Sequence, residues 1–211
     1  MSTATASKER PIIFNADEVR AVLDGRKSAT RRVVKEPDLT NFICDGEPPT
    51  IEDKYGEHHP ATDWCPYGRR GDRLWIRETW WHHKECRPPF EHQRESCVRY
   101  DATEPPERRD WLSEQYTRRS PVHMPRWASR ITLEITDVAV ERLQDISEDE
   151  ARAEGVEAYF DDGVWYYGPY NRGHADPRAA FARLWDSRHK PPHDWASSPW
   201  AWIVRFRRVE P

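Results

Sequence analysis

The sequence predicts an α+β domain or a compact β-barrel with short helices, rather than a doubly wound sheet. The strongest evidence is residues 129–143, where Ile131, Leu133 and Ile135 alternate with polar residues as in a half-buried strand. Helical patterns are short, carry capping residues and occur in three places. Strands and helices do not alternate regularly, and no repeat is present, so a parallel sheet of βαβ units is disfavoured.

The composition is compatible with a folded chain despite its polarity. Charged residues make up 33% of the 211 residues and hydrophobic residues 36%. The 11 Trp, 8 Tyr and 6 Phe compensate, because each aromatic side chain buries a large apolar area. The length fits a single domain spanning residues 1–211. The formal net charge of −4 excludes a strongly basic nucleic-acid coat protein, but it leaves room for a local basic patch.

The first half of the chain combines short elements with proline-rich stretches. Asn15 and Glu18 form a capping-box pattern, and Gly25 is placed to end the helix that they begin. β-branched and aromatic residues predict strands at 11–14, at the end of 26–35, at 73–80 and at 97–100. Prolines punctuate two long stretches, which are expected to be loop insertions near residues 36–70 and 82–126.

The second half continues from the long strand at 129–143. Ser147 and Glu150 form a second capping box, in a helix that Gly155 ends. Asp176 precedes a third helix, which begins with Pro177 at a position where a missing N–H does no harm. The remaining segments are a turn-rich aromatic stretch and a strand, at residues 159–170 and 200–209.

The apolar pattern does not predict a membrane span, because the densest apolar run is only residues 200–204. The first ten residues lack the apolar stretch of a secretory signal. We therefore expect a cytoplasmic protein without a membrane partner. In that compartment its four cysteines would be reduced.

Cysteine and histidine residues are numerous enough to raise the question of zinc. The set is Cys44, His58, His59, Cys65, His82, His83, Cys86, His92 and Cys97. No CxxC pair is present, and the interval from His82 and His83 to Cys86 is the only ligand-like spacing. We expect no cofactor and no metal in the chemistry, with a structural zinc as the less favoured alternative.

A run of basic and hydroxyl side chains occupies residues 25–32, with the sequence Gly-Arg-Lys-Ser-Ala-Thr-Arg-Arg. These side chains can contact an anion or a base edge, but they also suit a solvated loop. Positions three apart face opposite sides of an ideal strand. The chain must therefore bend if Lys27 and Thr30 are to reach one pocket.

Six blocks of the chain share the pattern of a known family. They are Gly25–Arg32, Gly71–Trp80, His123–Ile131, Leu143–Ser147, Trp185–Ser187 and Ser198–Trp200. The first block resembles the opening signature of the ASCH family, a branch of the PUA-like β-barrels. The later blocks resemble the larger, phage-associated ASCH proteins. The resemblance covers most of residues 11–206 outside the insertions, and it implies a mixed β-barrel with short flanking helices.

The resemblance also implies two activities. PUA-like barrels often bind RNA or modified bases, and a class of small ASCH proteins hydrolyses the amide of N4-acetylcytidine. That class uses a Lys, a Thr three residues later and a Glu in the helix after the long strand. The matching residues here are Lys27, Thr30 and Glu154. The competing glutamates are Glu78, Glu148 and Glu150.

Four further residues are expected to contact the substrate: Arg26, Arg32, Glu78 and Trp127. Arg32 would stabilise the oxyanion or hold the substrate. Trp127 follows an arginine just before the long strand, and a flat aromatic ring beside an arginine can stack on a base.

These residue types suit amide hydrolysis. Thr30 is a weak nucleophile until a base takes its proton. Lys27 would be that base only in its neutral form, which burial and neighbouring arginines favour and a pairing with Glu154 opposes. Glu154 would protonate the departing cytosine nitrogen or activate the hydrolytic water.

The expected function is hydrolysis of the N4-acyl amide of acylated cytosine nucleosides. One alternative is a non-catalytic module that binds RNA or modified DNA, with arginines at 31–32, 69–73 and 205–208 holding phosphates. Another is a phage-associated accessory protein with a vestigial pocket. The two insertions could form a lid, admit bulkier acyl groups or make a surface for a partner.

Overall fold

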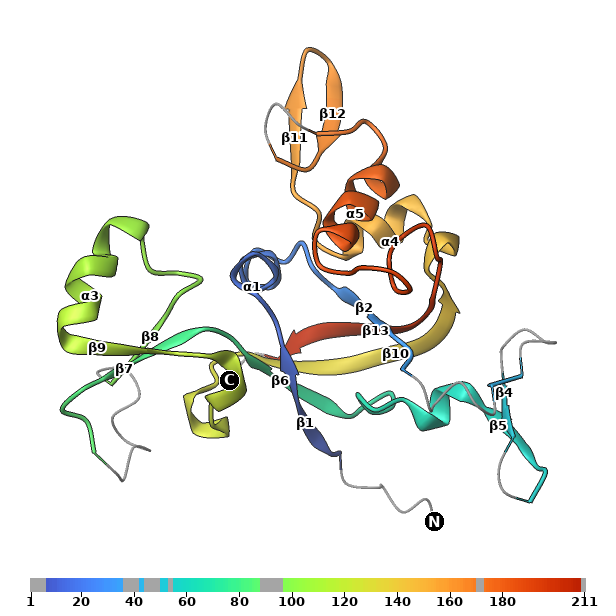
Figure 1. The fold of residues 1–211 in the computed structure, drawn as a ribbon, viewed down its shortest axis with the longest axis horizontal. Helices are drawn as coiled ribbons and strands as arrows, with labels where there is room; N and C mark the ends of the chain where they lie inside the picture. Colours follow the sequence, from blue (N-terminus) through green and yellow to red (C-terminus); the bar gives the residue numbers. More distant parts are fainter. Residues whose placement is uncertain are drawn as a thin grey trace.

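Five strands form a central sheet in the computed structural model (Figure 1). They are β1 (Glu9–Ile13), β2 (Ala29–Val33), β6 (Arg73–Arg77), β10 (Thr132–Arg142) and β13 (Trp200–Val209). Their order is β1–β6–β10–β13–β2, with β1 parallel to β6 and the other neighbours antiparallel. The structure describes residues 7–35, 42–43, 50–52, 55–87, 97–169 and 173–209.

The central sheet is open in the part of the chain that the structure describes. β1 and β2 form its two edges, and no pairing between them is seen there. The protein is therefore an α+β structure with more sheet than helix. The closed barrel that the resemblance implies is not seen in these residues.

The long strands β10 and β13 form the middle of the sheet and confirm the two strongest strand predictions. In β10, Leu133 and Ile135 are buried while their neighbours are half-buried, as alternation predicts. The run Ala201–Val204 in β13 is buried throughout. Both faces of that strand are therefore covered, which explains why its sequence is apolar without alternation.

The capping patterns correctly predict where two helices begin. In α1 (Ala16–Leu23) the side chain of Asn15 accepts a hydrogen bond from the Glu18 N–H, and the Glu18 side chain accepts one from the Asn15 N–H. The second capping box likewise opens α4 (Glu148–Ala153). Such caps satisfy N–H groups that the first turn of a helix leaves without partners.

The third predicted helix, α5 (Pro177–Asp186), begins after the capping side chain of Asp176. It packs with α4 at one end of the sheet (Figure 1). Phe181 and Trp185 of α5 are buried in the apolar cluster between these elements. No helix in the described segments is long and apolar enough to cross a bilayer.

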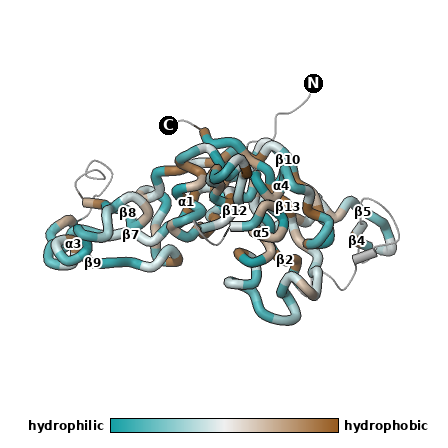
Figure 2. Tube along the Cα trace, turned by 90° about the horizontal axis from the view of Figure 1, so that it is seen from above, coloured by the Kyte–Doolittle hydropathy of each residue, from teal (hydrophilic) through white to brown (hydrophobic). Residues whose placement is uncertain are grey.

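Both predicted insertions contain regular structure where they are described, so the expectation of loops was wrong there, whereas the strand predicted at residues 97–100 is confirmed. Their elements are β3 (Phe42–Ile43), β4 (Thr50–Glu52), β5 (His58–Pro60), β7 (Trp80–His83), β8 (Val98–Tyr100), α3 (Arg109–Gln115) and β9 (Tyr116–Arg119). The sheets β3–β4–β5 and β8–β7–β9 extend from opposite sides of the central sheet (Figure 2). Burial of Trp81, Leu112 and Tyr116 in one cluster holds α3 against the second of these sheets.

The aromatic stretch predicted to form turns is a β-hairpin, made of β11 (Ala158–Asp161) and β12 (Val164–Tyr167). Asp162 and Gly163 link the strands with φ angles of 45° and 79°. Asp-Gly is a frequent pair in two-residue hairpin turns that need positive φ at both positions.

Single turns of 3-10 helix complete the fold: η1 (Ala61–Trp64), η2 (Pro106–Arg108), η3 (Pro121–His123), η4 (Arg126–Ala128) and η5 (Leu143–Asp145).

Cys86 and Cys97 form a disulfide, which corrects the expectation that all the cysteines are reduced. Their Cα atoms are 5.9 Å apart, a normal separation for such a bond. Cys65 is free and buried, whereas Cys44 and His92 lie outside the described residues. Among the residues described, no three His, Cys, Asp or Glu side chains gather as metal ligands would.

Removing this disulfide is expected to cost about 3 kcal/mol of unfolding free energy, because the bond closes a short loop in the unfolded chain. The double variant Cys86→Ala/Cys97→Ala would show this loss in urea unfolding. Wild-type protein in reductant is the matched control and should fall to the same midpoint. Equal stability of the oxidised wild type and the double variant would contradict the prediction.

Candidate functional site

A cavity of about 260 Å³ lies between α1, β2 and the end of α5. Its lining residues are Ile13, Asn15, Glu18, Lys27, Thr30, Arg31, Arg32, Glu154, Phe181, Leu184, Trp185, Arg188 and His189. Three of the predicted site residues, Lys27, Thr30 and Glu154, therefore meet at one cavity together with Arg32. The chain achieves this by the expected bend, since Lys27 lies before β2 begins.

Backbone contacts fix the position of Lys27. After α1 the chain turns at Gly25, whose φ is 75°, and the Lys27 N–H donates to the Ala21 carbonyl at 2.9 Å. Lys27 then forms an isolated β-bridge with Glu154, just after α4. The segment between α1 and β2 is thus attached to a residue 127 positions further along the chain.

The side chains of Lys27 and Glu154 form a buried ion pair. Nζ of Lys27 donates to Glu154 Oε2 at 2.8 Å and to the Glu154 backbone carbonyl at 2.9 Å. The two side chains are only 2% and 5% exposed. Both contacts use Nζ as a hydrogen-bond donor, whereas the role proposed from the sequence required it as a proton acceptor.

Arg31, which also lines the cavity, joins the pair. Its side chain is 1% exposed, with Nη1 at 3.5 Å from Glu154 Oε1 and Nη2 at 3.0 Å from Glu150 Oε2. Burial raises the pKa of Glu150, but the hydrogen bond from the Ser147 N–H and the Arg31 and Arg205 guanidiniums outweigh it and leave that pKa below its usual value. Glu150 therefore neutralises arginines and does not line the cavity.

The other two competing glutamates also lie outside the cavity lining. Glu148 pairs with Arg152 at 2.8 Å on the exposed side of α4. Glu78 is buried and pairs with Arg130 at 2.9 Å. Of the four candidate glutamates, the lining includes Glu154 alone.

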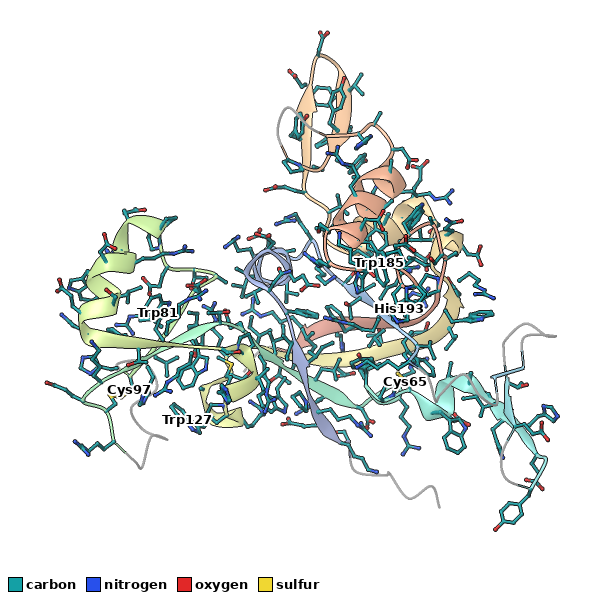
Figure 3. The ribbon with its side chains drawn as sticks, in the orientation of Figure 1. Cys65, Trp81, Cys97, Trp127, Trp185 and His193 are labelled. Atoms are coloured by element: carbon teal, nitrogen blue, oxygen red, sulfur yellow. A yellow bond between two sulfur atoms is a disulfide. The ribbon has the colours of Figure 1, made fainter. Side chains whose placement is uncertain are left out.

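Two of the residues expected to bind substrate, Glu78 and Trp127, lie outside the lining of this cavity, and their contact with substrate stays a prediction. Glu78 neutralises Arg130, whose guanidinium also stacks over Tyr100 at 3.9 Å. Trp127 packs edge-on against Trp80, with ring centroids 6.1 Å apart, near the β8–β7–β9 sheet. Figure 3 shows Trp127 well away from Trp185, a residue of α5 that lines the cavity.

Arg26 lines a neighbouring cavity of about 380 Å³, which borders the same Glu154. Its Nη1 donates to the Gly155 carbonyl at 2.9 Å. Arg26 thus holds the backbone next to Glu154. It lines the neighbouring cavity, and Thr30 lines the smaller one on the other side of Glu154. The expected contact of Arg26 with substrate stays a prediction.

Three arginines of the proposed phosphate-binding face pair with carboxylates, whereas the contribution of Arg69, Arg70, Arg73 and Arg208 stays a prediction. Arg205 pairs with Asp137 and Glu150, and Arg207 pairs with Glu134 at 2.9 Å. Arg31 is buried against glutamates. Because these charges are neutralised one by one, they do not form a continuous cationic surface with Arg32.

Glu18 is a cavity residue that the sequence argument missed. Its Oε2 caps α1, while its Oε1 lies 3.3 Å from Arg188 Nη1 and 3.9 Å from Lys27 Nζ. The capping-box pattern already accounts for Glu18 as a helix cap. The sequence therefore gives no separate indication that Glu18 also lines the cavity. The short spacing between Glu18 and the basic motif was the available clue.

His189 is the second residue that was missed. It lies three positions beyond α5, and its ring stacks on Trp185 with centroids 4.0 Å apart and an angle of 17° between the planes. Nδ1 lies 3.1 Å from the Trp185 carbonyl oxygen. The i, i+4 spacing of Trp185 and His189 at the end of a helix could have pointed to this contact.

The cavity carries more positive than negative charge. Its lining contains four cations, Lys27, Arg31, Arg32 and Arg188, and two carboxylates, Glu18 and Glu154. Such a setting can stabilise an oxyanion or hold an anionic product.

No family model, curated protein or solved structure matches the chain.

Replacing Gly155 by alanine is expected to destabilise the protein and disturb the ion pair. Its φ is +86°, and an added Cβ would lie 2.8 Å from the Cβ atoms of both Ala21 and Lys27. Gly163→Ala is a matched control, since its φ is +79° but nothing lies within 4 Å of the added carbon. Both variants should lose about 1–2 kcal/mol from backbone strain, and only Gly155→Ala should lose more. Equal losses of unfolding free energy in urea would show that the close contacts of the added Cβ with Ala21 and Lys27 do not affect stability.

Proposed function

We propose that the protein is an amidohydrolase that cleaves the N4-acyl amide of acylated cytidine or cytosine nucleosides, giving cytidine and a carboxylic acid. The observation that carries the proposal is the meeting of Lys27, Thr30 and Glu154 at one small cavity. These are the residues that the ASCH resemblance singles out, so the proposal includes a relation to that PUA-like family. A cavity of about 260 Å³ suits part of a small molecule better than a folded polymer.

In the proposed first step, the Thr30 Oγ attacks the acyl carbon and loses its proton. The C=O π electrons move to oxygen, and the Lys27 ammonium and the Arg32 guanidinium stabilise the resulting oxyanion. When the carbonyl re-forms, the bond from carbon to N4 breaks and N4 takes a proton. Cytidine leaves, and the acyl group remains on Thr30 as an ester.

In the second step, water attacks the ester carbon. The bond to Thr30 breaks, the hydroxyl regains a proton, and the carboxylic acid leaves. Glu154 has both oxygens near cations, so in this mechanism it holds Lys27 in place instead of exchanging protons itself. The positive charge of the lining favours the developing oxyanion over the neutral amide, which is the difference that lowers a barrier.

The test is a spectrophotometric assay of the purified protein on N4-acetylcytidine and N4-benzoylcytidine. The expected result is loss of the acylcytosine absorbance with equal amounts of cytidine and carboxylic acid formed. No turnover at high protein concentration would overturn the proposal. Salt-dependent binding of labelled RNA or DNA in that case would favour the non-catalytic module instead.

A further inference from the structure

The proposed mechanism needs a proton acceptor, and the two carboxylates of the cavity are poorly suited to that role. Glu154 Oε2 lies 2.8 Å from Lys27 Nζ, and Oε1 lies 3.5 Å from Arg31. Glu18 accepts a hydrogen bond from the Asn15 N–H and lies 3.3 Å from Arg188. Both carboxylates thus already have cations or N–H donors at their oxygens, in positions where a proton from Thr30 would have to go.

His189 has the features that these carboxylates lack. The Trp185 carbonyl oxygen can only accept hydrogen bonds and also receives the Arg188 and His189 N–H groups, so the contact favours the tautomer with the proton on Nδ1. In the neutral ring Nε2 then carries the lone pair. Within the described residues Nε2 makes no hydrogen bond to the protein, whereas stacking on Trp185 holds the ring in place.

We propose that His189 Nε2 is the proton acceptor for Thr30, an inference that rests on the proposed function. As the Thr30 Oγ forms its bond to the acyl carbon, the hydroxyl proton passes to Nε2. The imidazolium then gives this proton to N4 as the bond from carbon to nitrogen breaks. In the second step His189 takes a proton from water and returns one to the Thr30 oxygen, so the ring ends neutral.

The surroundings of His189 favour its neutral form. Burial lowers its pKa, the hydrogen bond to the Trp185 carbonyl opposes this, and the charges of Arg188, Arg32 and His193 lower it further. The other charged groups that line the same cavity are Glu18, Lys27, Arg31 and Glu154, which largely neutralise one another. At neutral pH the ring is therefore ready to accept a proton.

The experiment compares pH–rate profiles of the wild type, His189→Gln and His193→Gln. Since the neutral ring is the active form, wild-type kcat/KM should fall as the pH drops through a single midpoint below 6.5. His189→Gln should lower kcat by about 10²- to 10⁴-fold and lose this acidic limb. His193 is the control, because it is exposed and does not line the cavity. Its variant should keep the rate at neutral pH and the acidic limb, with the limb shifted slightly to higher pH because the charge of His193 no longer lowers the pKa of His189.

A second readout does not depend on turnover. The ¹⁵N chemical shifts of the His189 ring should report a proton on Nδ1 in the neutral wild-type protein. A proton on Nε2, or a His189→Gln variant that keeps the wild-type kcat and acidic limb, would overturn the inference and leave the proposed function intact. A wild-type protein without turnover would overturn both.

Discussion

Replacing Thr30 by valine is expected to lower turnover of N4-acetylcytidine by at least ~10³-fold. The variant loses the hydroxyl that is proposed to attack the acyl carbon, but it keeps the branched shape. Thr30 is 1% exposed and pairs with Val204 across β2 and β13, so valine should preserve the strand. Acid-quenched wild type should also carry the acyl mass on the peptide that contains residue 30, and the variant should not.

Thr30→Ser is the matched control for this prediction. It keeps a hydroxyl and removes one methyl group, at a cost of about 1 kcal/mol of stability. Turnover should stay within about tenfold of the wild type. If Thr30→Val were as active as Thr30→Ser, water would have to attack the amide directly, and the nucleophile would be wrongly assigned.

Replacing Lys27 by methionine is expected to reduce both stability and turnover. The change leaves the Glu154 carboxylate buried without its closest cation, a loss of about 3–5 kcal/mol of unfolding free energy. It also removes a proposed stabiliser of the oxyanion, which should lower kcat by about 10²- to 10³-fold. Urea unfolding and steady-state kinetics measure the two effects separately.

The double variant Lys27→Met/Glu154→Gln separates the buried charge from the catalytic loss. With both charges gone, the protein should recover much of the stability that the single variant loses, since no unpaired ion remains. Turnover should stay low. Equal stability of the single and double variants would show that Arg31 alone compensates Glu154.

The elements that the sequence predicted well are those whose signals are local. A capping box needs only four consecutive residues, so Asn15 and Ser147 marked two helix starts correctly. The alternation in β10 is local in the same sense. In the β8–β7–β9 sheet, β8 was predicted from its own residues, but the pairing of β7 with β8 and with β9 depends on contacts that no local pattern reveals.

The residues of the candidate site divide in the same way, into those with a local sequence signal and those without one. The basic motif was visible because its residues are contiguous, and the resemblance supplied the position of Glu154. Glu18 and His189 reach the cavity only because α1 and α5 pack beside β2, which no periodicity reveals. Trp127 and Glu78 lie away from the cavity for the converse reason. Their residue types suited a site, but tertiary packing gave them partners at another place.

The bridge between Lys27 and Glu154 has a consequence for how the protein is made. On the ribosome, the segment with Lys27 and Thr30 emerges early, whereas its partners in α4, α5 and β13 emerge more than a hundred residues later. β2 has no neighbour in the central sheet until β13 has been synthesised. The segment with Lys27 and Thr30 therefore stays without its partner strand while the chain is incomplete. A nascent chain that stops before β13 does not form the cavity. Activity would thus report that synthesis has reached β13.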